Sequence, residues 1–283
     1  MKTSQEASSF NSLLRKCPRC GADNSSIKPL VYSWHEWTLK SCIICKFVYL
    51  ENPPGYEALV AEYAWERNHG DRSVRMRKEY PFTYNFSRLW KKIRRFLIRK
   101  PNKLANRVSK FFLPGVVVDI GCGTGDYLAK LPNTYQPLGI EISEELARLA
   151  TERLSDRKGK VLAMSAIEGL SSVPEGTVSG IIMRSFLEHE QQPVDLLSFA
   201  WKALRPGGSA IIKVPNYDSI NRKVMGNRWC GFRFPGHVNY FTPESLQEMV
   251  ESVGFSIKSF GVFDRFYLSD NMWMVANKPR LDS

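Results

Sequence analysis

The chain has 283 residues, of which 43% are hydrophobic and 24% are charged, and these proportions are ordinary for a soluble globular protein. They exclude a disordered chain, a collagen-like repeat and a multi-span membrane protein, and the length allows one large domain or two smaller ones. Lys plus Arg number 40 against 28 Asp plus Glu, which gives a net charge of +12.

The positive charge is concentrated in one segment. Residues 80–118 contain ten Lys or Arg and no Asp or Glu, so only +2 (12 − 10) belongs to the rest of the chain. An electrostatic contact with a partner is therefore expected at this segment and not over the whole surface.

The N-terminal residues 1–12 are polar and are expected to form a loose tail. Residues 1–16 lack the apolar run of a secretory signal, and no run of 18 apolar residues occurs in the sequence. The expected location is the cytoplasm, where the six cysteines stay reduced.

Four cysteines form two CxxC pairs, one made by Cys17 and Cys20 and the other by Cys42 and Cys45. Two such pairs are what a tetrahedral zinc site requires, with each pair on a knuckle turn. Gly21 suits the first knuckle, whereas Lys46 stands where a second Gly is usual. We expect a zinc ribbon over residues 13–54 holding a structural Zn²⁺, because four thiolates leave no open position for catalysis; a redox-active pair is the alternative.

Residues 55–112 are predicted to form a helical, basic linker. Its apolar residues between 86 and 97 recur at steps of 3, 1, 3, 3 and 1, which is the spacing of one helix face opposite a cationic one. Three interpretations stay open: this helix packs on the C-terminal domain, which we favour, or residues 86–100 touch an anionic membrane, or they attract a phosphate-bearing substrate.

Strand and helix patterns alternate over residues 113–283. Strands are predicted at residues 116–119, 138–142, 161–164, 180–183, 209–214, 255–262 and 272–277. Helices are predicted at residues 127–131, 144–153, 194–204 and 243–253. This alternation favours an α/β, doubly wound fold with a parallel sheet covered on both faces.

A glycine loop follows the first of these strands, with Gly121, Gly123 and Gly125 in alternation. Glycine lets the backbone approach a ligand closely, and the carboxyl end of such a sheet is where ligands bind. A dinucleotide motif would need Gly at the position of Asp126, and a carboxylate there opposes a pyrophosphate. An S-adenosyl cofactor carries no phosphate, and Glu141, at the end of the second predicted strand, could accept hydrogen bonds from its ribose. The alternative is a glycine turn that only packs helix against strand.

These residues resemble the class I S-adenosylmethionine-dependent methyltransferases over about residues 113–283. The motifs that carry the resemblance are 118–125, 139–141, 187–189, 204–208, 235–246 and 254–255. The resemblance implies a Rossmann-like seven-stranded sheet with its last strand antiparallel. It also implies these cofactor-binding residues: Asp119, Gly121, Cys122, Gly123, Gly125, Glu141, Ile142, Ala166, Ile167 and Arg184.

Two positions depart from the family pattern. Ser165-Ala166-Ile167 stands where an acidic residue near the adenine is common, and Ser179 stands where an Asp commonly begins the fourth strand. We therefore expect either a weak affinity for the cofactor or a different contact with its adenine.

The acceptor is expected to be a small molecule and not a nucleic acid. An N-terminal zinc ribbon on this type of domain looks like a group associated with sugar, polysaccharide and other small-molecule biosynthesis, so the resemblance implies a sugar-containing or anionic acceptor. Arg184-Ser185-Phe186-Leu187 also lacks the Asn/Asp-Pro-Pro-aromatic motif of amino-directed nucleic-acid methyltransferases. Two alternatives stay open: an RNA methyltransferase that uses the ribbon and basic helix for phosphate contacts, and a non-catalytic binding module.

Two histidines are candidates for the acceptor's base. His189 follows the fourth strand, and His237 lies in the long insertion after the fifth. The alternative is that each only stabilises its loop. Five aromatic residues of the insertion region line an acceptor pocket or belong to the core: Tyr217, Trp229, Phe232, Phe234 and Tyr240.

Overall fold

The structure, a computed structural model, describes residues 14–55 and 103–280. The predicted tail and most of the predicted linker, including residues 86–100, lie outside these ranges. Within the described ranges, no helix combines the length and the apolar character needed to cross a bilayer.

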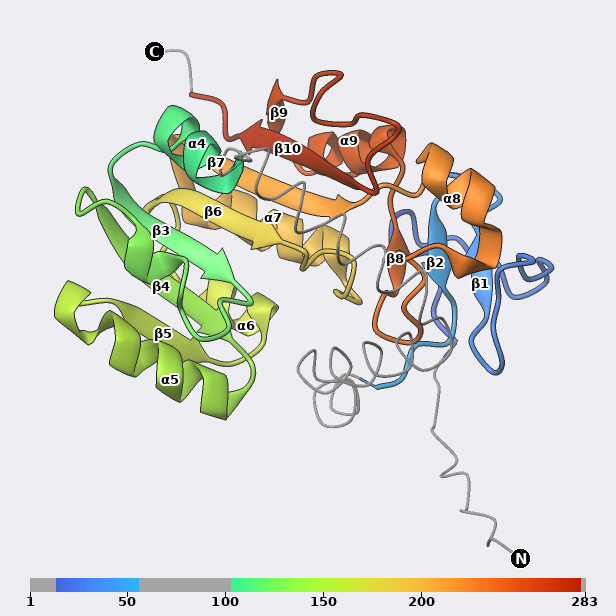
Figure 1. The fold of residues 1–283 in the computed structure, drawn as a ribbon, viewed down its shortest axis with the longest axis horizontal. Coiled ribbons are helices and arrows are strands. Elements are labelled where there is room, and N and C mark those ends of the chain that lie inside the picture. The colour runs from blue at the N-terminus through green and yellow to red at the C-terminus, as the bar shows by residue number, and fades with distance from the viewer. Residues whose placement is uncertain (1–13, 56–102, 281–283) are drawn as a thin grey trace, which may run out of the picture.

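A seven-stranded sheet forms the centre of the larger unit, in the order β5-β4-β3-β6-β7-β10-β9 (Figure 1). Its strands are β3 (Gly115–Ile120), β4 (Tyr135–Glu141), β5 (Lys160–Ala163), β6 (Val178–Arg184), β7 (Leu204–Pro215), β9 (Ser256–Ser259) and β10 (Asn271–Asn277). Strands β5, β4, β3, β6 and β7 pair in parallel, and β10 is antiparallel to both β7 and β9. The predicted Rossmann-like sheet with an antiparallel last strand is confirmed.

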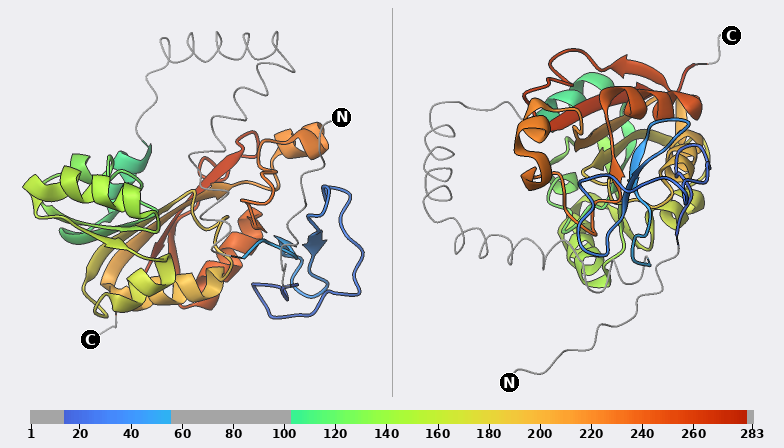
Figure 2. Two further views of the ribbon diagram at one scale, coloured as in Figure 1. Left: turned by 90° about the horizontal axis from the view of Figure 1, so that it is seen from below. Right: turned by 90° about the vertical axis from the view of Figure 1, so that its right-hand side faces the viewer.

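Helices cover both faces of this sheet (Figures 1 and 2). On one face lie α4 (Lys103–Phe111) and α5 (Glu144–Leu154), and on the other lie α6 (Ala166–Ser172), α7 (Pro193–Ala203) and α9 (Pro243–Ser252). Consecutive strand residues alternate between the two faces: Val117 packs in the core under α4 and α5, and Val118 in the core under α7 and α9.

The helices differ from the prediction at three places. After the glycine loop the chain makes only a 3₁₀ turn, Leu128–Lys130, because Pro132 follows closely and Leu128 and Leu131 are buried where they stand. Helix α6 was not predicted, although Ser165 and Glu168 form a capping box at its start. Helix α8 (Ile220–Met225) in the insertion was also missed.

The end of the predicted linker packs on the large unit. Helix α4 buries Leu104 and Val108 against the sheet, and Arg107 forms an ion pair with Asp264. Three of the ten basic residues of the linker region lie on α4, and the other seven lie outside the described residues. The contact that we favoured for residues 86–100 therefore stays a prediction.

The N-terminal unit shares a small sheet with the insertion. Strand β1 (Leu39–Ser41) pairs with β2 (Val48–Leu50), and β2 pairs with β8 (Asn239–Tyr240), all antiparallel (Figure 1). The insertion after β7 thus adds a strand to the N-terminal unit. The two paired segments are distant in the sequence, and local patterns did not predict that they meet.

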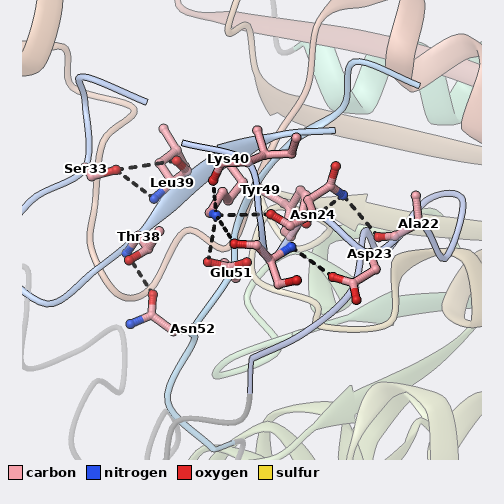
Figure 3. Close-up of polar contacts among 12 residues, drawn as sticks. Ala22, Asp23, Asn24, Ser33, Thr38, Leu39, Lys40, Tyr49, Glu51 and Asn52 are labelled. Atoms are coloured by element: carbon pink, nitrogen blue, oxygen red, sulfur yellow. Dashed lines mark hydrogen bonds and ion pairs between the residues drawn. The ribbon is translucent and has the colours of Figure 1, made fainter. Parts of the chain in front are cut away.

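Polar groups organise the interior of the N-terminal unit (Figure 3). The Lys40 ammonium, 4% exposed, donates to Asn24 O at 3.1 Å and lies 3.4 Å from the Glu51 carboxylate. Asn24 Nδ2 donates to Tyr49 Oη at 3.1 Å, and Asn24 Oδ1 accepts from Ile43 N at 3.0 Å. Buried polar groups of this kind are stable only when they are paired, so these residues fix one arrangement of the loops.

Arg15 joins the N-terminal unit to the large one. Its guanidinium donates to Leu50 O (2.7 Å), Gln191 O (3.1 Å), Asn239 Oδ1 (3.1 Å) and Val238 O. Burial lowers the pKa of Arg15 to about 10, so the side chain stays charged near neutral pH. One side chain therefore satisfies acceptors from three chain segments.

We expect Arg15→Met to lower the free energy of unfolding by about 2–4 kcal/mol, because several acceptors lose their donor inside the contact. Urea unfolding measures this change. Arg148→Met is the control: Arg148 makes two ion pairs on the surface of α5, and such pairs contribute about 0–1 kcal/mol. Equal effects of the two substitutions would contradict the role given to Arg15.

Candidate functional site

The glycine loop turns sharply at the carboxyl end of β3. Gly121, Gly123 and Gly125 have φ values of +68°, +55° and +73°, a region that favours residues without a Cβ. A Cβ on Gly125 would lie 3.2 Å from that of Ala150 in α5, so this glycine packs loop against helix. A Cβ on Gly123 would meet nothing within 4 Å, so Gly123 borders open space.

Glu141, at the end of β4, closes the loop from the side. Its Oε2 accepts from Gly123 N at 2.9 Å, and its Oε1 accepts from Ser143 N at 3.0 Å. The residue is 8% exposed, and each carboxylate oxygen keeps further acceptor capacity. Glu141 therefore has a structural role, and it also presents acceptors beside the loop.

A hollow lies beside the loop at this edge of the sheet. Its lining residues are Gly121, Ile140, Glu141, Ile142, Met164, Ala166 and Phe186. Four of them were predicted as cofactor-binding: Gly121, Glu141, Ile142 and Ala166. The Phe186 ring lies over Gly121, where a Cβ would come within 2.8 Å of it. The prediction missed Ile140, which lies inside the motif 139–141, and Met164 and Phe186, which lie outside the motifs of the resemblance.

The other predicted cofactor residues surround the hollow without lining it. Asp119 is 5% exposed, and burial raises its pKa to about 7, against the opposing effect of Arg184 and with a smaller contribution from Glu141. Arg184 is exposed at the end of β6. The Cys122 thiol packs toward Gly139 in the core, and Ile167 is half-buried in α6. Their contact with a cofactor stays a prediction.

The two positions that depart from the family pattern have local roles. Ser165 caps α6: its Oγ accepts from Glu168 N, and its backbone N donates to Glu168 Oε2. Ser179, near the start of β6, donates to Pro114 O at 3.0 Å. It therefore lies at the amino end of its strand, away from the hollow.

His189 and His237, the two predicted candidates for the acceptor's base, are brought together. Their ring centroids are 4.7 Å apart and the rings are nearly perpendicular. His189 is placed by the turn that begins at Phe186, since its N–H donates to Phe186 O at 2.8 Å. Burial lowers the pKa of His189 to about 4, so its imidazole is neutral near pH 7.

Three charged residues, Glu188, Lys213 and Arg233, lie near this pair, and the prediction did not assign them a role. Glu188 is 1% exposed, and burial raises its pKa to about 7 although Lys213 and Arg233 oppose the shift. Lys213 Nζ donates to Ser185 Oγ at 2.7 Å, and burial lowers the pKa of Lys213. Lys213 and Arg233 thus place positive charge near Glu188, and Arg184 lies close enough to Lys213 to act on its charge.

The five aromatic residues of the insertion belong to a core and not to a pocket wall. Trp229 and Tyr240 are 1% and 2% exposed, and they pack with Leu39 and Val48 of the N-terminal unit. Tyr217 is buried in the same cluster, and Phe232 and Phe234 lie half-buried at its margin. This core unites the insertion with strands β1 and β2.

The four paired cysteines converge as predicted. Their Sγ atoms all lie within 4.8 Å of one another, and the closest pairs, Cys17–Cys45 and Cys20–Cys42, are each 3.5 Å apart. Zn–S bonds of about 2.3 Å in a tetrahedron give S···S separations of about 3.8 Å. The donor set and its spacing therefore fit a zinc ion.

The two cysteine turns share one hydrogen-bond pattern. In the first, Cys17 N donates to Ala22 O and Gly21 N to Cys17 O; in the second, Cys42 N donates to Phe47 O and Lys46 N to Cys42 O. Gly21 and Lys46 have φ of +73° and +58°. Lys46 thus adopts the left-handed conformation that explains why Gly is usual there.

A comparison with solved structures supports the fold. A chain from the complex of the Haloferax volcanii Trm112 methyltransferase activator with a methyltransferase superposes with a TM-score of 0.52. The identity is 14%, and the match covers 64% of this chain and 90% of that one.

Curated relatives match shorter segments. Trans-aconitate 2-methyltransferase of Deinococcus radiodurans is 29% identical over 38% of this chain and 42% of its own. A ubiquinone biosynthesis O-methyltransferase of Xanthomonas campestris is 27% identical over 41% of this chain and 50% of its own. The chain thus matches less than two thirds of either relative's length.

A family model described as "Methyltransferase domain" matches residues 89–259. The matched range contains the glycine loop, Glu141, both histidines and strands β3 to β9 of the sheet, and it is more than half of the chain. The chain therefore belongs to this methyltransferase-domain family.

Proposed function

We propose that this protein is a cytoplasmic S-adenosylmethionine-dependent methyltransferase with a small, sugar-containing or anionic acceptor, and that its four paired cysteines hold a structural zinc ion. The sugar-containing acceptor rests on the sequence resemblance alone.

One observation carries the cofactor assignment. The Glu141 carboxylate is held by the backbone of the glycine loop on one oxygen and by Ser143 on the other, beside the hollow that Gly121 and Ala166 line. Loop and carboxylate are thus fixed relative to each other before any ligand arrives. Such an arrangement suits the ribose and methionine parts of S-adenosylmethionine, which would supply a methyl group on a sulfonium when bound.

The acceptor side supports a small anionic substrate. Lys213 and Arg233 act on Glu188, and Arg184 acts on Lys213; a group of cations of this kind attracts carboxylate or phosphate groups. The names of two relatives, a trans-aconitate methyltransferase and an O-methyltransferase, agree with a small acidic or hydroxyl-bearing acceptor. In this proposal His189 and His237 remove the acceptor's proton, and the pocket mainly aligns the acceptor with the methyl group.

The alternative of an RNA methyltransferase depends on the basic segment. Seven of its ten cations lie outside the described residues, and no described contact favours a nucleic acid. The membrane contact through residues 86–100 is likewise a prediction that the described residues do not address.

Gly123→Arg is expected to abolish binding of S-adenosylhomocysteine in calorimetry while the zinc content stays unchanged. Its Cβ meets nothing within 4 Å, so the long side chain extends into the open space proposed for the ligand, and the positive φ of +55° adds a backbone strain that the control must share. Gly176→Arg is the matched control, because Gly176 has φ +71° and open surroundings in an exposed turn. Normal binding by Gly123→Arg would overturn the cofactor site, and no binding by the unmodified protein would favour the non-catalytic alternative.

Glu141→Gln is expected to weaken S-adenosylhomocysteine binding about 10- to 100-fold, since an amide can accept only one of the two backbone N–H bonds. Titration calorimetry gives the dissociation constant directly. Glu144→Gln, on the exposed first turn of α5, should leave binding unchanged. An unchanged affinity of Glu141→Gln for S-adenosylhomocysteine would contradict the role proposed for this carboxylate.

Zinc removal should loosen the N-terminal unit and spare the glycine loop. Mass spectrometry of the metal content should find zinc bound by thiolates, and a strong chelator should remove it. The Leu50 amide, which donates to Val238 O, should then lose its protection from hydrogen exchange, while the Gly121 amide in the loop after β3 keeps its own. Retained Leu50 protection after complete metal loss would contradict a structural role for zinc.

A further inference from the structure

The imidazoles of His189 and His237 are both anchored through Nδ1. His189 Nδ1 lies 2.7 Å from Gly236 O, and His237 Nδ1 lies 2.8 Å from Gly231 O. A carbonyl oxygen only accepts hydrogen bonds, so Nδ1 carries the proton in each ring and Nε2 carries the lone pair. Donation of one ring nitrogen to a backbone carbonyl is the arrangement that orients histidines which ligate metals.

The neighbouring Glu188 carboxylate has an oxygen that nothing satisfies. Glu188 is 1% exposed, and its Oε2 has no hydrogen-bond partner. Leaving a buried polar atom unpaired costs about 1–3 kcal/mol, and more for a charged group. Its main chain is held in place, because Glu188 O accepts from Val238 N at 2.8 Å and from Asn239 N at 3.1 Å. The backbone of Glu188 is therefore fixed, and among the described residues Oε2 of its carboxylate has no partner that a further ligand would have to displace.

These three side chains converge. Each offers one ligand atom, and the three atoms lie within 4.8 Å of one another. We infer that Glu188, His189 and His237 form a second metal site, which binds one divalent transition-metal ion between the two imidazoles and the carboxylate. The cysteine site does not compete for this role, because its four thiolates are remote in sequence and form a closed set.

The donor set indicates the kind of ion. Two imidazoles and one carboxylate suit Zn²⁺, Fe²⁺, Co²⁺ or Ni²⁺, whereas Mg²⁺ and Ca²⁺ prefer all-oxygen sites. Three protein ligands also leave positions open for water or substrate. Lys213 and Arg233 oppose a bare cation here, so the site should bind its ion less tightly than the cysteines do and more tightly when an anionic ligand is present.

A metal ion here would refine the proposed chemistry, and this step rests on the proposed function. The Nε2 lone pairs would coordinate the ion and would not take the acceptor's proton directly. An acceptor oxygen on an open position would instead have its pKa lowered by the ion. The metal site itself is tested by metal binding alone, independently of methyl transfer.

Cobalt binding to the full-length protein tests the site. The protein is stripped with a chelator and titrated with Co²⁺, and bound metal is counted by mass spectrometry while the visible spectrum separates thiolate-bound from nitrogen- and oxygen-bound cobalt. We expect two equivalents, the first with intense thiolate bands and the second with weak bands. Glu188→Gln and His189→Asn should each lose the second equivalent and keep the thiolate bands, which show that the fold around the ribbon is intact.

Glu190→Gln is the matched control, because Glu190 is also a buried carboxylate, 4% exposed, and lies close by in the chain but outside the triad. It should retain two equivalents. One equivalent in the unmodified protein, or two in the Glu188→Gln variant, would overturn the second site. Neither result depends on cofactor binding, so failure here is distinguishable from failure of the proposed function.

Discussion

The backbone of residues 237–239 bonds to both units of this protein, and the position of the histidine pair depends on these bonds. Val238 O accepts from Leu50 N and from Arg15 of the N-terminal unit, while Val238 N donates to Glu188 O of the large unit. One residue therefore links β2 to the turn after β6. Because the backbone groups of a buried strand must be paired, neither unit can shift at this place without breaking the bonds of the other.

A different constraint fixes the cofactor side. Parallel strands end at one edge of the sheet, so the loops after β3, β4 and β6 meet there whatever their sequences. The chain places three kinds of group at that edge: glycines with positive φ, the bridging Glu141, and Phe186 over the loop. Register in the sheet, with Asp119 opposite Gly139, sets the reach of Glu141 to Gly123.

The features that could be predicted from the sequence are those that depend on residues close together in the chain. The seven strands, the glycine loop with Glu141 and the cysteine pairs follow from spacing within a few residues or from two motifs that meet at a known edge of a sheet. Arg15 and the pairing of β2 with β8 join segments that are distant in the sequence, and no local pattern encodes such a partner. For the same reason the aromatic residues around Trp229 looked like pocket candidates, although their partners are Leu39 and Val48 of the N-terminal unit. Helix α6 could have been predicted from the sequence, because Ser165 and Glu168 have the spacing of a capping box at its start.

The position of His237 gives the N-terminal unit a consequence beyond its own stability. His237 directly precedes Val238, whose carbonyl is held by Leu50 and Arg15, and Glu188 and His189 are held from the other side by Val238 N and Gly236 O. The second cysteine turn leads into β2, since Cys42 N donates to Phe47 O. Leu50 N of β2 donates to Val238 O, and His237 directly precedes Val238. The cysteine-rich unit thus supports the backbone that carries His237, although its cysteines belong to a separate cluster from the two histidines and Glu188.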